Sequence, residues 1–216
     1  MKKAKILILG WSVLLGTSIK AQWGSGNVAA PMIALNSGDI SSLDNVKSVM
    51  IVYDYTDMGV GAFRKEEDYI KKKSEEMEKK EKGSSEKFKK DWVDARERRY
   101  QPRFEELFNK EGKGINLTGS SKPNGSDYTL NVHTIFIEPG MNIGISKKPA
   151  FIDLECTFKD KSGKELCVFY VKNAIGSNMS GMDYAVEARV VESYAKAGKM
   201  LVQGIEKERK KAKKKK

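Results

Sequence analysis

Three strand-like segments follow one another without an intervening helix in the second half of the chain. They span residues 128–137, 151–158 and 166–171, and each is rich in β-branched and aromatic residues. After them, apolar residues recur at three- and four-residue steps between Tyr184 and Ile205, which predicts a long amphipathic helix. Consecutive strands favour an antiparallel meander, and a helix with one apolar face must cover it. The sequence therefore predicts a two-layer α+β fold, with a small mixed or antiparallel sheet and helices packed on one face.

The first half of the chain adds another strand and a charged helical excursion. Residues 46–56 are β-branched and apolar in their middle, which predicts a strand. Opposite charges recur at helical spacing in 65–82, and a stronger apolar stripe runs through 86–110. Pro102 is expected to kink or restart the second of these helices. We therefore expect a helical excursion over 65–110 whose second half packs on the sheet.

The excess of positive charge lies in two terminal segments. The formal net charge of the 216 residues is +11. Residues 1–21 hold four lysines and no acid, and residues 207–216 hold eight basic residues and one acid. The residues between them balance at 28 basic and 28 acidic. A nucleic-acid module needs a basic face to neutralise phosphates. Because residues 22–206 have no net charge, we expect no nucleic-acid partner.

The amino-terminal segment, residues 1–21, has the pattern of a secretory signal peptide. Lysines precede an apolar run over 6–19, which is shorter than the roughly 20 residues that span a bilayer. We expect cleavage after Ala21, although Ile19 is larger than the small residue preferred three positions before the cleaved bond. The alternative is an uncleaved amino-terminal anchor. No cysteine lies near this junction, so we expect an exported periplasmic or extracellular protein that is not a lipoprotein.

The remaining chain has the length of a single domain. Residues 22–45 are rich in Gly, Ser, Asn and Ala, which predicts an irregular leader. Residues 46–206 form the expected α+β domain, and residues 207–216 form a polybasic tail. This tail predicts attraction to an anionic surface, to which each nearby lysine contributes about 1 kcal/mol, and a solvated, frayed end is the alternative. The lysines concerned are Lys210, Lys211, Lys213, Lys214, Lys215 and Lys216.

Two cysteines, Cys156 and Cys167, lie in the expected hairpin. A two-residue turn that begins at Lys161 would place them directly opposite each other, close enough for a disulfide. A bulge at Gly163 would place Cys156 opposite Val168 and send the two cysteines to opposite faces. Export would permit a disulfide, and two buried thiols that pack as small apolar side chains are the alternative.

Acidic side chains gather just after the first strand, at Asp54, Asp57, Glu66, Glu67 and Asp68. They predict either the site of a hydrolase-like enzyme or ordinary acids that favour the positive end of the following helix.

The chain has one histidine, His133, on the polar face of a predicted strand. A general base needs partner groups, and zinc needs three or four protein ligands. The glycine-rich segment 140–144 lacks the lysine of a phosphate-binding loop. We therefore expect no catalytic residue, no metal site and no cofactor.

An aromatic stripe runs along the second part of the helical excursion, at Trp92, Tyr100, Phe104 and Phe108. At helical spacing, such a stripe predicts either core packing or a surface that binds a partner.

The order of these elements resembles that of small sheet-and-helix domains in bacterial envelope accessory proteins. The opening strand at 49–56, the strand at 127–140 and the hairpin at 150–171 are similar in pattern to three such groups. These are the TolB amino-terminal domain, the CsgG-like curli-secretion lipoproteins and the lipoprotein activators of penicillin-binding proteins. The similarity spans 46–206 and extends to uncharacterised secreted bacterial proteins. The chain departs from the lipoproteins because it lacks an acylated cysteine, and it adds the excursion at 65–110.

We therefore expect an exported, non-enzymatic, envelope-associated binding or assembly-accessory protein with a protein partner in the envelope. The alternative is a periplasmic, hydrolase-like enzyme that uses the acids at the end of the first strand.

Overall fold

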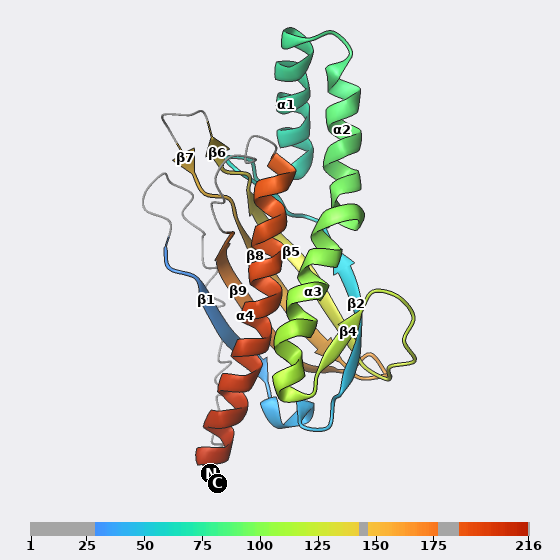
Figure 1. The fold of residues 1–216 in the computed structure, drawn as a ribbon, viewed down its shortest axis with the longest axis vertical. Helices are drawn as coiled ribbons and strands as arrows, with labels where there is room; N and C mark the ends of the chain where they lie inside the picture. Colours follow the sequence, from blue (N-terminus) through green and yellow to red (C-terminus); the bar gives the residue numbers. More distant parts are fainter. Residues whose placement is uncertain (1–28, 143–146, 177–185, 216) are drawn as a thin grey trace, which may run out of the picture.

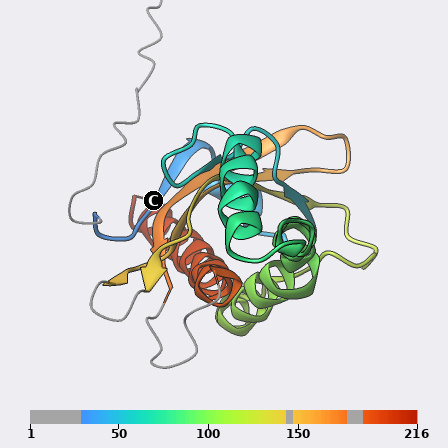
Figure 2. The same cartoon turned by 90° about the horizontal axis from the view of Figure 1, so that it is seen from above.

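The sheet of this protein is mixed and is covered by helices on one face (Figures 1 and 2). The computed structural model describes residues 29–142, 147–176 and 186–215. The strands are β1 (Met32–Gly38), β2 (Ser48–Asp54), β3 (Gly59–Val60), β4 (Thr118–Ser120), β5 (Thr129–Glu138), β6 (Met141–Asn142), β7 (Lys147–Lys148), β8 (Phe151–Lys159) and β9 (Glu165–Ile175). The helices are α1 (Glu66–Lys80), α2 (Ser84–Ala95), α3 (Gln101–Gly112) and α4 (Val186–Lys214), with short helical segments η1 (Ile40–Leu43), η2 (Arg96–Tyr100) and η3 (Lys113–Ile115).

The strand order confirms the predicted α+β class. The main sheet runs β1-β9-β8-β5-β2-β4, with β3 also paired to β5. The predicted meander is present, because β5, β8 and β9 are antiparallel neighbours. The first predicted strand, β2, instead lies parallel to β5, because the helical excursion returns the chain to the same end of the sheet.

The core lies between the sheet and the helices α3 and α4. Inward strand residues such as Leu130 and Val132 are fully buried, and so are Tyr194 and Leu201 of α4. At Gly198 an added Cβ would lie 2.4 Å from the carbonyl oxygen of Phe104. The backbones of α3 and α4 therefore touch at this point, which only glycine permits.

The described part of the predicted leader, residues 29–45, contains regular structure. Within residues 22–45 lie β1 and η1, and β1 pairs antiparallel with β9 from Met32↔Lys172 to Gly38↔Cys167. The sequence pattern hid this strand because its short apolar stretch is flanked by residues with low β-propensity. Its stability comes from pairing with β9 and from Ile33, which packs against Gly204 of α4.

The helical excursion begins as a hairpin and continues as one long helical run. The glycine at 83 separates α1 from α2, as the sequence predicts. From α2 the chain passes through η2 into α3 without a break. Instead of the expected kink or restart at Pro102, a wider helical turn lies just before the proline. In η2 the Gln101 N–H donates to the Arg96 carbonyl, five residues back, which is a π turn. This wider turn directly precedes the proline, which lies in the first turn of α3.

Two bulges lie between the tip of the β8–β9 hairpin and the cysteines, so neither register predicted for the cysteines is correct. The predicted turn at Gly163 is present, where its N–H donates to the Asp160 carbonyl and its φ is +84°. Lys159 then pairs with Glu165, but Phe158 pairs with Cys167, which leaves Leu166 as a second extra residue.

The second bulge returns both cysteines to the same face of the sheet. Cys156 pairs with Phe169, two residues beyond Cys167, so the cysteines are diagonal neighbours and not an opposed pair. Both thiols are free and buried. Diagonal neighbours across antiparallel strands lie about 7–8 Å apart, which exceeds the usual reach of a disulfide.

Candidate functional site

An open hollow lies at the carboxyl end of β2 and has a volume of about 610 Å³. The sequence prediction that acids gather there is correct for Asp54, Asp57, Glu66 and Glu67, which all line it. Asp68 lies exposed on α1, outside the lining. A neighbouring hollow of about 520 Å³ extends along η2, and the two share side chains from β2 and η2.

Arg96, the first residue of the π turn, organises this hollow. Its guanidinium forms an ion pair with the Glu66 carboxylate, and the Trp92 indole N–H donates to the same carboxylate. The guanidinium also lies over the Tyr55 ring, 4.5 Å from its centroid. We call the contacts of Glu66 with Arg96 and Trp92 the Glu66 latch, because they tie the start of α1 to α2 and η2. The sequence prediction missed Arg96, since it lies far from Glu66 along the chain and no local spacing links the two.

Asp54 is held in a local turn. Its carboxylate accepts hydrogen bonds from the Thr56 N–H at 2.9 Å and the Thr56 hydroxyl at 2.7 Å. Partial burial alone would raise the pKa of Asp54, but these hydrogen bonds and nearby His133 together lower it below its usual value. His133 lies beside Asp54 in the β2–β5 register, and its Nε2 is 2.9 Å from the Thr56 carbonyl oxygen. Histidine and aspartate therefore both help to fix this turn.

Two tyrosines contribute to the inner side of the hollow. The Tyr53 hydroxyl donates to the Gln101 carbonyl oxygen at 3.2 Å, and its ring packs edge-on against Phe104. Burial raises the pKa of Tyr55 to about 12. Aromatic rings and side chains of both charges thus make a surface suited to polar contacts. Donors bind the carboxylates of Asp54 and Glu66. The lowered pKa of Asp54 is the opposite of what a general acid near neutral pH needs.

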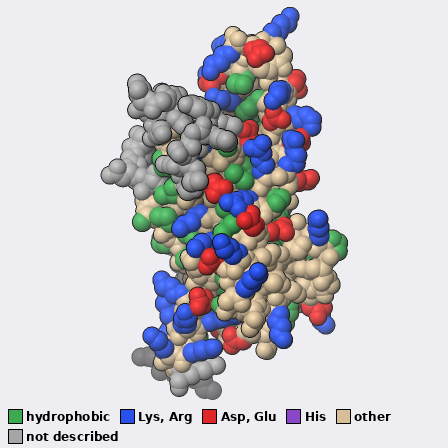
Figure 3. All heavy atoms as spheres, in the orientation of Figure 1, with side chains coloured by type: hydrophobic (Ala, Val, Ile, Leu, Met, Phe, Trp, Pro, Cys, Tyr) green, Lys and Arg blue, Asp and Glu red, His purple; other side chains and the backbone are tan. Residues whose placement is uncertain are grey.

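The hairpin of α1 and α2, which we call the arm (residues 66–95), projects from the body at one end of the molecule (Figure 1). Acidic and basic side chains intermingle over its surface (Figure 3). Ion pairs join Lys87 to Asp91 and Lys90 to Asp94, each at 2.7 Å. Exposed pairs of this kind add little stability, so they chiefly keep the surface of the arm soluble.

The base of the arm is fixed by aromatic packing. The Tyr69 ring lies 5.0 Å from Trp92, 6.1 Å from Phe63 and 6.3 Å from Phe88, centroid to centroid. The helical aromatic stripe that the sequence identified is core and not a partner surface, since each member is at most 1 % exposed. Its members are Trp92, Tyr100, Phe104 and Phe108.

The basic tail continues α4 as an ordered helix as far as Lys214, so it is not the frayed end that the sequence left open. The Arg209 guanidinium donates to the carbonyl oxygens of Leu43 and Ile115, and Ala212 packs against the core. Exposed lysines occupy the rest of this segment, and four of them line a shallow groove of about 350 Å³: Lys207, Lys210, Lys211 and Lys214. We call the exposed lysines the basic ridge: Lys207, Lys210, Lys211, Lys213, Lys214 and Lys215. Lys216 and the predicted signal peptide lie outside the described residues.

Within residues 29–142, 147–176 and 186–215, no helix combines the length and apolar composition that a membrane span needs. The same ranges hold no group of three or more His, Cys, Asp or Glu side chains placed to bind a metal ion.

Comparisons with known proteins give two distant structural similarities. No family model matches the chain, and no curated protein matches it. The PelC dodecamer from Paraburkholderia phytofirmans, in space group P6, is similar with a TM-score of 0.36 and 8 % identity, covering 78 % of this chain and 98 % of that chain. A point variant of that dodecamer, in space group C2, has a TM-score of 0.33 and the same identity and coverage. Similarities at this level carry no argument about the function of the chain.

Proposed function

We propose that this chain is an exported, non-enzymatic accessory protein of the bacterial cell envelope, and that it binds a protein partner through the arm. The observation behind the proposal is the shape of the molecule, in which a helical hairpin with a fixed base stands out from a complete sheet-and-helix body (Figure 1). The outer half of the arm is not needed to pack the core. Contacts with another molecule would account for its presence.

The arm is built to hold its direction. Its helices pack chiefly on each other, and they meet the body where α1 begins, near β3, and where α2 runs into η2. The Glu66 latch and the aromatic cluster around Tyr69 secure both points. Short charged helices are marginally stable alone, so this support favours an element that is held ready for binding. A pre-ordered binding element loses less conformational entropy when its partner docks.

Export and envelope association rest on sequence features. Residues 1–21 have the order of a secretory signal, and the strand pattern of 46–206 resembles that of envelope accessory domains. The basic ridge adds a surface for attraction to anionic groups of the envelope. These features support the same compartment from different parts of the chain.

The hydrolase-like alternative gains less from the geometry of the hollow. Asp54 has a lowered pKa and is bound by Thr56, while Glu66 is held by Arg96 and Trp92. Such contacts favour a structural role for both carboxylates over proton transfer. Binding through the arm is therefore the function that we propose.

Site-specific photo-cross-linking in cells that express the protein tests this proposal. A photoreactive residue replaces Lys80 near the tip of the arm, Lys87 on α2, or, as a control, Lys161 in the β8–β9 turn. All three positions are exposed. We expect discrete cross-linked protein species from Lys80 and Lys87 and none from Lys161.

A competition experiment defines the result that would contradict binding through the arm. Excess unlabelled wild-type protein should remove the cross-links, whereas a variant with Lys79→Glu, Lys80→Glu and Lys82→Glu at the arm tip should compete poorly. If the arm positions give no discrete species, or if the tip variant competes as well as wild type, the arm is not the partner surface.

A further inference from the structure

We infer that the basic ridge docks the protein on an anionic lipid bilayer in one orientation, with the arm directed away from the lipid. This inference rests on the proposed export, since it places the protein beside membranes. It goes beyond simple attraction because five of the six ridge lysines occupy fixed positions on α4, which is bound to the body. A flexible tail would bind lipid without orienting the domain.

The fixed position of the ridge follows from the contacts on the opposite side of α4. Arg209 reaches two backbone carbonyls, at Leu43 beside η1 and at Ile115 in η3. Ala212, one turn further along, packs against the core. Because this side faces protein, the helix cannot bury an apolar face in the bilayer, and its contact with lipid must be electrostatic.

The charges of the ridge are only partly neutralised within the chain. Lys210 pairs with Glu206 at 2.6 Å, and Lys211 pairs with Glu208 at 2.7 Å. The other ridge lysines form no ion pair with any described residue, and they are Lys207, Lys213, Lys214 and Lys215. Phosphate groups of lipid headgroups can supply negatively charged partners for these ammonium groups.

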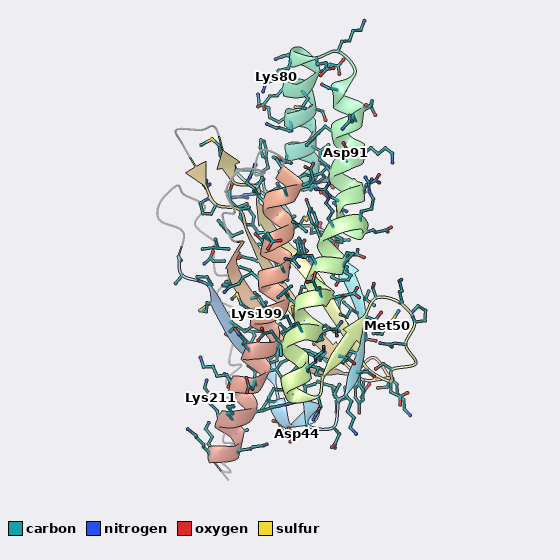
Figure 4. All side chains as sticks on the ribbon, in the orientation of Figure 1. Asp44, Met50, Lys80, Asp91, Lys199 and Lys211 are labelled. Carbon is teal, nitrogen blue, oxygen red and sulfur yellow. The ribbon has the colours of Figure 1, made fainter. Side chains whose placement is uncertain are left out.

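The ridge and the arm tip lie at opposite ends of the long axis. Lys211 on α4 and Lys80 on α1 mark these two ends (Figure 4). The arm holds nine basic and ten acidic residues over 66–95, so an anionic surface has little preference for it. Docking by the ridge therefore leaves the arm facing away from the membrane, where a partner can reach it.

Vesicle binding by the purified protein tests the charge requirement. The vesicles contain phosphatidylglycerol mixed with phosphatidylcholine, and vesicles of phosphatidylcholine alone serve as the reference. Replacing Lys207, Lys213, Lys214 and Lys215 with Gln should weaken binding more than a hundredfold, at roughly fivefold per lysine. A matched control replaces Lys71, Lys72, Lys79 and Lys80 of the arm with Gln and should leave binding within about twofold, because those lysines lie far from the lipid.

A gain-of-binding variant makes the test independent of losses in folding. Glu206→Gln frees Lys210 and removes one negative charge from the ridge, so binding should tighten about fivefold. Equal losses from the ridge and arm variants would overturn the proposal, and so would no change with Glu206→Gln. A short DNA duplex that binds more tightly than the anionic vesicles would assign the ridge to nucleic acid. Displacement by inorganic phosphate well below the salt concentration that displaces the vesicles would assign it to a free anion. Either result overturns docking on lipid.

Fluorescent labels test the orientation directly. Both native thiols are buried, so a cysteine introduced as Gln203→Cys beside the ridge, or as Lys80→Cys on the arm, can be labelled selectively. A quencher carried by the lipid headgroups should quench the label at 203 and spare the label at 80. Equal quenching of both would overturn a single orientation. Synthetic vesicles contain no protein partner, so failure here leaves the cross-linking test of the arm unaffected.

Discussion

At the scale of single residues, the two cysteines behave as apolar core residues. Cys156 and Cys167 are at most 1 % exposed, and burial raises the pKa of Cys167 to about 12. A thiol reacts as its thiolate, which burial disfavours. In the folded protein we therefore expect neither cysteine to react with a maleimide at neutral pH, although the diagonal pair lies in an oxidising compartment if the protein is exported.

Thiol counting by mass spectrometry checks this prediction. Maleimide added in denaturant without reductant should label two thiols, and maleimide added to the folded protein should label none. A count of zero in denaturant would show a disulfide, and rapid labelling of the folded protein would contradict the burial.

The same burial gives a pH dependence. The folded pKa of Cys167 lies above its unfolded value of about 8.5, so the unfolded state loses its proton first as the pH rises. The stability contributed by the buried thiol is full below about pH 8.5 and is lost progressively between there and about pH 12. In urea titrations at rising pH, Cys167→Ser should therefore show a smaller fall in the free energy of unfolding above about pH 9 than wild type does.

At the scale of elements, the Glu66 latch determines how firmly the arm is attached. The Glu66 side chain is 14 % exposed, and its carboxylate binds both a guanidinium and an indole. Hydrogen bonds to charged groups contribute about 1.5–3 kcal/mol each to stability. We expect Glu66→Gln to lower the free energy of unfolding by about 1–3 kcal/mol and to speed amide exchange in the first turns of α1.

A neighbouring carboxylate provides the control for the latch. Glu67 is exposed, so Glu67→Gln should change the free energy of unfolding by no more than about 0.5 kcal/mol. Hydrogen exchange read by mass spectrometry compares the two variants. Unchanged protection of α1 in Glu66→Gln would show that the aromatic cluster alone holds the arm.

Sequence patterns predicted the elements with strong periodicity and missed those that depend on distant pairing. β5 and the hairpin strands follow from local β-branched and aromatic composition, α1 from the spacing of opposite charges, and α2 and α3 from apolar spacing; all are present. β1 and the extra bulge at Leu166 depend on partners across the sheet. At the site, the acidic residues that lie close together in the sequence were predicted. Arg96 was not predicted, because its contact with Glu66 joins distant parts of the sequence and leaves no periodic signal.

At the scale of the whole molecule, the edge strand β1 belongs to the main sheet, although it precedes residues 46–206, the domain expected from the sequence. It pairs with β9 between Cys167 and Lys172, and Ile33 meets α4 at Gly204. Without β1, the backbone groups of β9 would form a new open edge, which favours aggregation, and the apolar contacts of Ile33 and Leu35 would be lost. Burying an aliphatic side chain contributes about 1.5–3 kcal/mol when complete, so half-buried residues here contribute about half as much each.

Two truncated chains test this role of β1. A chain that begins at Asp39 lacks β1, whereas a chain that begins at Ala29 retains it. We expect the shorter chain to lose about 2–4 kcal/mol in the free energy of unfolding, from the contacts of Ile33 and Leu35 together with the pairing of β1. It should also elute partly as aggregates in size-exclusion chromatography, because β9 is then an unprotected edge. Equal urea midpoints and equal elution for the two chains would show that the sheet is stable without β1.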